Sequence, residues 1–191
     1  MPSGTVLVVD DDEAYLWYVD AALKTAGLVP VLCPSAYTAT KALAEGRFDV
    51  VLSDLKLPGG SGLEVLESAR RSDPLCVGII MTAFATLEAG LSAMDAGVYD
   101  FLAKPCPAEV LVGSVRRALE HHGLKKELAR RAEGFAAVRR EFAEAVASLV
   151  DVSTRLERLP GAPGELAELA RKAGALRESS LLLKARLDGL G

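Results

Sequence analysis

Short apolar runs alternate with helical segments five times within roughly the first 110 residues, and this alternation restricts the fold more than any other feature. Each run is too short for a helix and too apolar for a loop, which favours a buried strand. The predicted strands are 5–9, 28–32, 49–54, 77–81 and 99–102. The predicted helices are 13–25, 37–45, 62–71, 86–96 and a last one that begins after residue 107. Strict alternation predicts an α/β fold, a doubly wound parallel sheet with helices on both faces.

Polar side chains stand where the predicted strands end. Asp10 and Asp11 follow the first strand, Asp54 the third, Thr82 the fourth and Lys104 the fifth. Taken alone, Asp54 is more typical of an ordinary turn residue. In a parallel sheet, however, all carboxyl ends share one edge, and open α/β sheets bind ligands at that edge. We therefore predict one pocket with three carboxylates, a hydroxyl and an ammonium.

This set of side chains favours phosphoryl chemistry with a divalent ion. Three neighbouring carboxylates raise one another's pKa unless a cation joins them, and oxygen ligands with phosphate suit Mg²⁺. A carboxylate beside Mg²⁺ can act as a nucleophile toward phosphorus and form an aspartyl phosphate. Lys104 would neutralise charge on the phosphoryl group, and Thr82 would donate a hydrogen bond to it. Asp12, the third aspartate of its run, is predicted to be a helix N-cap instead.

Four short motifs occur in order along the chain. They are Val8-Val9-Asp10-Asp11, Asp54 followed by Pro58-Gly59, Met81-Thr82-Ala83, and Phe101-Leu102-Ala103-Lys104-Pro105. Together they resemble the receiver domain of bacterial two-component response regulators, which implies a flavodoxin-like (βα)5 fold. The resemblance covers roughly residues 4–120, and it is strongest to the receivers of enhancer-binding transcriptional activators.

The resemblance implies a role for each matching position. Asp54 would be the phosphoacceptor for a sensor histidine kinase, and Thr82 and Lys104 would hold the phosphoryl group. Such a protein is a signalling phosphoprotein and not an enzyme, apart from its own phosphorylation by phosphodonors and its own dephosphorylation. The implied magnesium ligands are Asp10, Asp11, Asp54 and the backbone carbonyl of Lys56.

The same resemblance implies a conformational switch and a control of phosphate lifetime. Thr82 and Phe101 would report phosphorylation, although Phe101 can also be an ordinary core residue. The Lys104–Pro105 bond is cis in the family. The lifetime-tuning positions would be Lys56 and Phe84. Because Phe84 is bulky enough to screen phosphorus from water, we expect slow self-dephosphorylation.

After the receiver, the sequence predicts a long helical extension. Residues 108–159 contain no proline, and a heptad seam predicts a coiled coil, with a bend near Gly123 where glycine weakens the helix. A turn at 160–164 would reverse the chain into a second apolar-faced helix, which makes residues 121–191 a helical coiled-coil hairpin. The shorter second helix would cover only the distal half of the first, so the rest of the seam favours a parallel homodimer. The seam positions of the first helix are Leu124, Leu128, Phe135, Val138, Phe142, Ala145, Leu149, Val152, Leu156 and Leu159, with His121 and Arg131 as exceptions.

Several outputs of this extension remain open. Docking of a downstream protein and dimerisation alone are both compatible with two apolar seams. DNA binding would require a compact helix-turn-helix unit, and neither histidine of the pair His121-His122 lies mid-bundle as a phosphotransfer histidine would. No Walker-type glycine loop appears, so we expect no ATPase domain.

Composition and charge exclude further classes. The net charge is −7 over residues 1–105 and +3 over 106–191, where the signs alternate, so a nucleic-acid tail is not indicated. No run approaches the length of a membrane span, no signal peptide is evident, and Cys33, Cys76 and Cys106 lack metal-ligand spacing, which together predict a cytoplasmic protein with reduced thiols. A dehalogenase-type phosphatase would need an aspartate at the position of Lys56. A scaffold that is never phosphorylated would not need the acidic pair, Asp54, Thr82 and Lys104.

Overall fold

The computed structural model describes residues 4–83 and 96–157, together with a few positions between 164 and 179. The chain divides into two compact units, residues 1–128 and 129–191. The predicted helix at 86–96 lies outside the described residues except for its last position, and the predicted turn and most of the helix after it lie outside them as well. Within the described part of the chain, no helix is both long and apolar enough to cross a bilayer.

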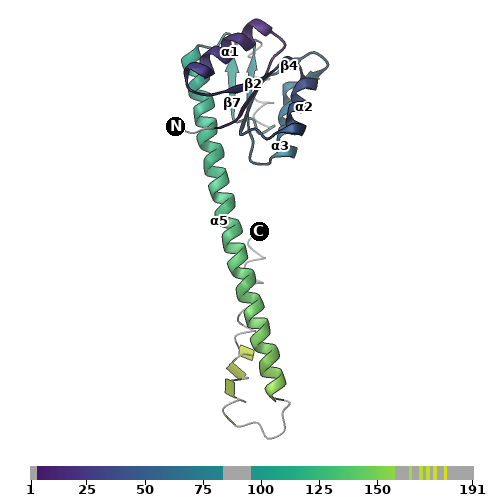
Figure 1. The fold of residues 1–191 in the computed structure, drawn as a ribbon, viewed down its shortest axis with the longest axis vertical. Coiled ribbons are helices and arrows are strands. Elements are labelled where there is room, and N and C mark those ends of the chain that lie inside the picture. The colour runs from purple at the N-terminus through teal and green to yellow at the C-terminus, as the bar shows by residue number, and fades with distance from the viewer. Residues whose placement is uncertain are drawn as a thin grey trace. The chain divides into compact units, whose positions relative to one another are not determined.

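The first unit is built on a parallel sheet of five strands in the order β2-β1-β3-β6-β7 (Figure 1). This order confirms the predicted doubly wound α/β fold. Each of the helices described below follows a strand along the chain, which is the arrangement that alternation predicted. The strands are β1 (Val6–Val9), β2 (Pro30–Cys33), β3 (Val50–Asp54), β6 (Val77–Thr82) and β7 (Asp100–Ala103). The helices are α1 (Glu13–Thr25), α2 (Ala36–Glu45), α3 (Gly62–Ser72) and α5 (Ala108–Glu157).

Helices cover both faces of the sheet because successive strand residues point to opposite sides. Val8 and Leu52 belong to a core cluster with residues of α1 and α5. Leu7 and Val51 belong to a second cluster with residues of α2 and α3. The central strands are buried on both faces, which explains why their sequences are continuous apolar runs and do not alternate.

Local side chains fix where the helices begin. The Asp12 carboxylate accepts hydrogen bonds from the backbone N–H groups of Ala14 and Tyr15, which confirms its predicted role as N-cap of α1. Ser61 caps α3 in a capping box with Glu64. A small antiparallel hairpin, β4 (Lys56–Leu57) and β5 (Gly60–Ser61), joins β3 to α3 and was not predicted.

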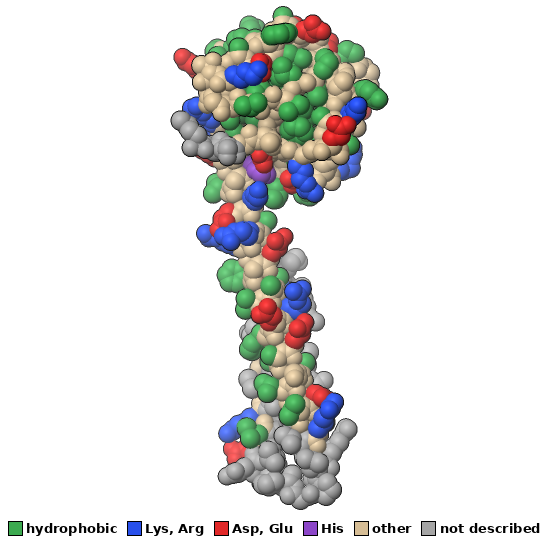
Figure 2. Space-filling view, viewed as in Figure 1, with side chains coloured by type: hydrophobic (Ala, Val, Ile, Leu, Met, Phe, Trp, Pro, Cys, Tyr) green, Lys and Arg blue, Asp and Glu red, His purple; other side chains and the backbone are tan. Residues whose placement is uncertain are grey.

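Helix α5 is far longer than a sheet-covering helix needs to be. It runs without interruption from Ala108 to Glu157, so the glycines at 123 and 134 do not break it. Its first turns are part of the core of the first unit, with Leu111, Val115 and Leu119 buried against the sheet. Later seam residues remain exposed, and apolar side chains are visible along the extension in Figure 2. The predicted long C-terminal helix is therefore confirmed as a helix.

Candidate functional site: an acidic pocket at the carboxyl edge of the sheet

Strand register brings the predicted polar residues to one edge of the sheet. Val9 pairs with Ser53, so the residues after each, Asp10 and Asp54, end neighbouring strands. On the other side of β3, Asp54 pairs with Met81, which places Thr82 next to it. The backbone N–H of Lys104 donates to the Thr82 carbonyl oxygen at 2.8 Å. The sheet therefore gathers residues that lie far apart in the sequence.

Three carboxylates meet at this edge. Asp10, Asp11 and Asp54 each offer an oxygen, and these oxygens lie within 4.8 Å of one another. Asp10 is fully buried, Asp54 is partly buried and Asp11 is exposed, so the cluster spans the boundary between protein interior and solvent. Burial raises the pKa of Asp10, and the opposing effect of Lys104, which lowers it, is smaller.

Lys104 supplies the positive charge of the pocket. Its Nζ forms an ion pair with Asp10 Oδ2 and lies 3.1 Å from Asp54 Oδ2. The Lys104 side chain is only 11% exposed, so water screens these contacts weakly. The peptide bond that follows it, Lys104–Pro105, is cis.

Tyr15 is a further member of the pocket, and no sequence pattern pointed to it. The Lys104 ammonium lies 4.6 Å from the centroid of the Tyr15 ring, a cation–π distance. Burial raises the pKa of Tyr15 to about 12, so its phenol is neutral at physiological pH. Residue 15 belongs to the first turn of α1, one turn away from the acidic run. In the sequence, the position of Tyr15 in the helical pattern did not distinguish it from an ordinary core residue.

The donor set fits a divalent cation. Three carboxylates meet in a partly buried place, where the Lys104 ammonium pairs with two of them, those of Asp10 and Asp54. All of the side-chain donors are oxygens, and hard ions such as Mg²⁺ prefer oxygen ligands. The backbone carbonyl of Lys56 is the further ligand that the sequence predicted. Lys56 begins β4, two residues after Asp54.

The remaining predicted site residues belong to the strands on the β7 side of Asp54 and to the segment after them. Thr82 is buried at the end of β6, beside the acidic cluster. Phe101 lies in β7, half-buried, and packs against the core cluster shared with α2 and α3. Phe84 lies outside the described residues.

Gly62 packs directly against the backbone of Asp54. A Cβ atom built on Gly62 would come within 2.0 Å of the Asp54 carbonyl oxygen. The Gly62 N–H also donates to the Leu55 carbonyl at 3.0 Å, so the start of α3 lies directly against the end of β3. Only a residue without a side chain permits this approach. The sequence pattern predicted that a helix begins at Gly62 but contained no sign of this contact.

Comparison with known proteins agrees with this geometry. Residues 6–116 match the family model described as the response regulator receiver domain. The chain is 38% identical over 122 residues to the DNA-binding transcriptional regulator NtrC of Escherichia coli, a match that covers 64% of this chain and 26% of that protein. The chain thus matches about a quarter of the length of this curated relative.

Solved structures show the same fold. A CheY-like response regulator receiver domain from Methanospirillum hungatei superposes with a TM-score of 0.61 at 27% identity, covering 64% of this chain and 98% of that one. The NtrX structure from Brucella abortus, in complex with ADP, superposes with a TM-score of 0.63 at 29% identity, covering 66% of this chain and 29% of that one. These matches confirm the predicted flavodoxin-like fold of the first unit.

Proposed function

Because the chain belongs to the response regulator receiver domain family, we propose that Asp54 accepts a phosphoryl group from a phosphohistidine of a sensor kinase. One observation carries the proposal, the convergence of the Asp10, Asp11 and Asp54 carboxylates with the Lys104 ammonium. Three acidic groups around one cation would be costly to keep in a partly buried pocket that had no ligand. We take that cost as support for a pocket that works with a metal ion and a phosphoryl group.

In this proposal Asp10, Asp11 and Asp54 hold Mg²⁺, together with the backbone carbonyl of Lys56. When bound, the ion supplies charge neutralisation for the oxygens of the phosphoryl group. The chain itself supplies the nucleophile, an oxygen of the Asp54 carboxylate. As the new P–O bond forms, the P–N bond to the donor imidazole breaks and the electron pair stays on that nitrogen, which then takes a proton.

Lys104 and Thr82 hold the transferred group. The Lys104 ammonium already lies 3.1 Å from Asp54 Oδ2, close enough to pair with a phosphoryl oxygen attached there. The Thr82 hydroxyl stands at the end of the neighbouring strand and donates a hydrogen bond to another oxygen. Phe101, half-buried on β7, reports the change by moving with Thr82. Lys56 and Phe84 set the lifetime of the acyl phosphate, which we expect to be long.

The output we propose is dimerisation through α5, with a downstream protein docking on the dimer. Seven apolar side chains of the seam are between 51% and 79% exposed in the single chain. Single exposed apolar residues are common on protein surfaces, but a continuous row of them marks an interaction surface. Their heptad spacing suits the same seam of a second copy. These residues are Leu124, Leu128, Phe135, Val138, Phe142, Leu149 and Val152.

Two alternatives use the same helix. Dimerisation could be purely structural and independent of phosphorylation. The relative from Escherichia coli is a DNA-binding transcriptional regulator, but the match covers only 26% of that protein, and residues 6–116 of this chain match the receiver domain. The alternating charges of the extension do not favour DNA as a partner.

Phosphorylation is tested with acetyl phosphate and intact-protein mass spectrometry. We expect the mass of one phosphoryl group to be added in the presence of Mg²⁺ and not in the presence of a chelator. Asp54→Asn should abolish the addition, whereas Asp151→Asn, an exposed aspartate of α5, should leave it unchanged. Mg²⁺-dependent labelling that persists in Asp54→Asn would refute the assignment.

Dimerisation is tested by analytical ultracentrifugation of the full chain with and without beryllofluoride. Phe135→Glu and Phe142→Glu should each give monomers, because a charge would enter the apolar seam. Arg140→Glu changes the charge more, but residue 140 is exposed and lies off the seam, so this variant should leave the dimer intact. If beryllofluoride alters neither the oligomeric state nor its dissociation constant, dimerisation is structural and the proposed readout is wrong.

A further inference from the structure

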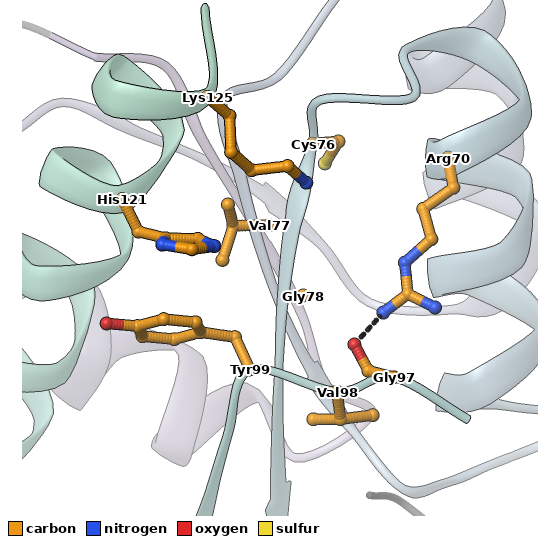
Figure 3. A pocket seen from close by; sticks show the side chains of 9 residues that line it. All are labelled: Arg70, Cys76, Val77, Gly78, Gly97, Val98, Tyr99, His121 and Lys125. Atoms are coloured by element: carbon orange, nitrogen blue, oxygen red, sulfur yellow. Dashed lines mark hydrogen bonds between the residues drawn. The ribbon is translucent and has the colours of Figure 1, made fainter. Parts of the chain in front are cut away.

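A second cavity lies at the opposite end of the sheet from Asp54. Its volume is about 320 Å³, and it is lined by residues of α3, the beginning of β6, the approach to β7 and the first part of α5. All lining residues belong to the first compact unit. The size falls at the lower end of cavities that hold small molecules. Figure 3 shows this cavity with its lining side chains.

The cavity is lined by basic side chains, although the protein as a whole is acidic. The chain carries a net charge of −4, and the first 105 residues are more acidic still. No aspartate or glutamate lines the cavity, whereas Arg70, His121 and Lys125 do. Lys125 forms no ion pair with the part of the chain that the structure describes. Arg70 donates to two backbone carbonyls, those of Ala96 at 2.6 Å and Gly97 at 2.5 Å, and to no carboxylate among the described residues.

Among the described residues, the nearby carboxylates form no ion pair with these cations. Asp49 and Asp73 both act electrostatically on the buried Cys76 thiol of the cavity wall, so they lie in the same region. Asp49 is engaged with Thr5 and His122. Asp73 accepts a hydrogen bond from the Leu75 N–H. Within the described part of the chain, the two cations therefore face the cavity without a paired carboxylate.

The Arg70 guanidinium is held in place and retains further donors. Its two hydrogen bonds fix the planar group against the turn that contains Gly97, a residue with φ of +70°. A guanidinium has five N–H donors, so three remain for a ligand. An anchored guanidinium loses little conformational freedom when an anion binds, which favours binding.

One wall of the cavity is aromatic. The Tyr99 and His121 rings stack with centroids 5.0 Å apart and an interplanar angle of 30° (Figure 3). The side chains of Val77 and Val98 add apolar surface, and Lys125 extends from α5 over Val77. The cavity thus combines an apolar, partly aromatic wall with two cations.

We propose that this cavity binds a small organic anion, a flat ring that carries a phosphate or carboxylate group. Arg70 and Lys125 hold the anionic group, and the ring packs against the wall formed by Tyr99, His121 and the valines. A bound anion would join α3 to α5 just before α5 leaves the first unit. Because the cavity lies at the other end of the strands from Asp54, its ligand does not compete with the phosphoryl group.

The test uses the full chain, labelled with ¹⁵N, in the presence of a chelator so that the Asp54 pocket holds no magnesium. The probes are phenyl phosphate, benzoate, inorganic phosphate and phenol. We expect saturable shifts of the Gly97, Tyr99, His121 and Lys125 amide signals with phenyl phosphate or benzoate. Inorganic phosphate and phenol, which offer only one half of the recognised chemistry, should bind at least about tenfold more weakly. Comparison of phenyl phosphate with benzoate identifies the preferred anionic group.

Two lysine variants make the test specific. Lys125→Gln should weaken binding by about tenfold or more, the loss expected for one charge-assisted hydrogen bond. Lys126→Gln removes the same charge one residue further along, from an exposed side chain, and should change affinity by less than about twofold. Equal effects of the two variants, or the absence of saturable binding, would overturn the proposal. Labelling of Asp54 by acetyl phosphate should survive in both variants, so the two proposals can fail separately.

Discussion

His122 Nδ1 lies 3.2 Å from Asp49 Oδ1, and this contact ties α5 to the amino ends of the central strands. The other oxygen of the same carboxylate, Asp49 Oδ2, accepts hydrogen bonds from the Thr5 backbone N–H at 2.6 Å and from the Thr5 hydroxyl at 3.0 Å. One carboxylate therefore joins β1, β3 and α5. His122 is only 6% exposed, which places it in the interior of the first unit. This burial agrees with a first compact unit that continues to Leu128.

Removal of the His122 side chain should destabilise the first unit. We expect His122→Ala to lower the free energy of unfolding by about 1–3 kcal/mol, because it leaves a cavity and removes the partner of Asp49. His122→Asn retains a nitrogen near the position of Nδ1 and should lose less. Glu120→Ala, an exposed neighbour on the same helix, is the control and should change little. Urea denaturation measures all three, and equal stability of His122→Ala and the control would refute the structural role of the contact.

The raised pKa of Asp10 predicts a particular pH dependence. Between the unfolded pKa of 3.8 and the higher folded value, the folded chain binds more protons at this group than the unfolded chain does. The contribution of Asp10 to stability therefore decreases as pH rises through that window, and above it the buried carboxylate is a constant cost. Asp10→Asn should be more stable than the native chain at neutral pH in the absence of divalent ions.

The stability difference between Asp10→Asn and the native chain isolates this group from the other carboxylates. The difference should be largest at neutral pH and should shrink as pH falls below the folded pKa of Asp10. Mg²⁺ should also reduce it, because the native chain alone retains the full set of carboxylates. Thermal unfolding over a pH series, with and without Mg²⁺, provides the measurement. A gap that widens in acid would show that burial does not dominate at Asp10.

Sequence patterns predicted the sheet because each buried strand carries its own signal. The apolar runs at 50–52 and 77–81 exclude water on both faces, and this requirement is visible locally in the chain. The polar residues at the strand ends were equally visible, so the convergence of Asp10, Asp54 and Lys104 followed from topology. Strand β2 begins at Pro30, two residues after the predicted start at residue 28. Differences of one or two residues are normal at the ends of secondary-structure elements.

Contacts between distant segments had no such local signal. Tyr15 under Lys104, the Arg70 bridge to Ala96 and Gly97, and the His122 contact with Asp49 all depend on how helices pack against the sheet. Their sequence separations exceed any helical or strand period, so periodicity could not reveal them. The cationic cavity could not be predicted from the sequence for the same reason, because its residues come from four segments.

The three cysteines should be unreactive in the native protein. Cys33, Cys76 and Cys106 are each 5% exposed or less. Burial raises the pKa of all three thiols, that of Cys76 to about 12. Because the thiolate is the nucleophile, Ellman's reagent should react slowly with the native chain and should titrate three thiols after unfolding in guanidinium. A thiol that reacts within seconds in the native state would contradict this burial.

Two glycines should respond in opposite directions to the same substitution. At Gly62 a new Cβ would collide with the Asp54 carbonyl oxygen, a backbone atom that can move only with the end of β3. Gly62→Ala should therefore destabilise the chain by about 2 kcal/mol or more and slow the labelling of Asp54.

At Gly123 no described atom lies within 4 Å of the place that a new methyl group would occupy, and the residue lies inside α5. There alanine should stabilise the helix by up to about 1 kcal/mol and leave labelling unchanged. Urea denaturation and acetyl phosphate labelling of the two variants check both effects, and a Gly62→Ala chain as stable and as readily labelled as the native one would show that α3 does not support the phosphoacceptor strand.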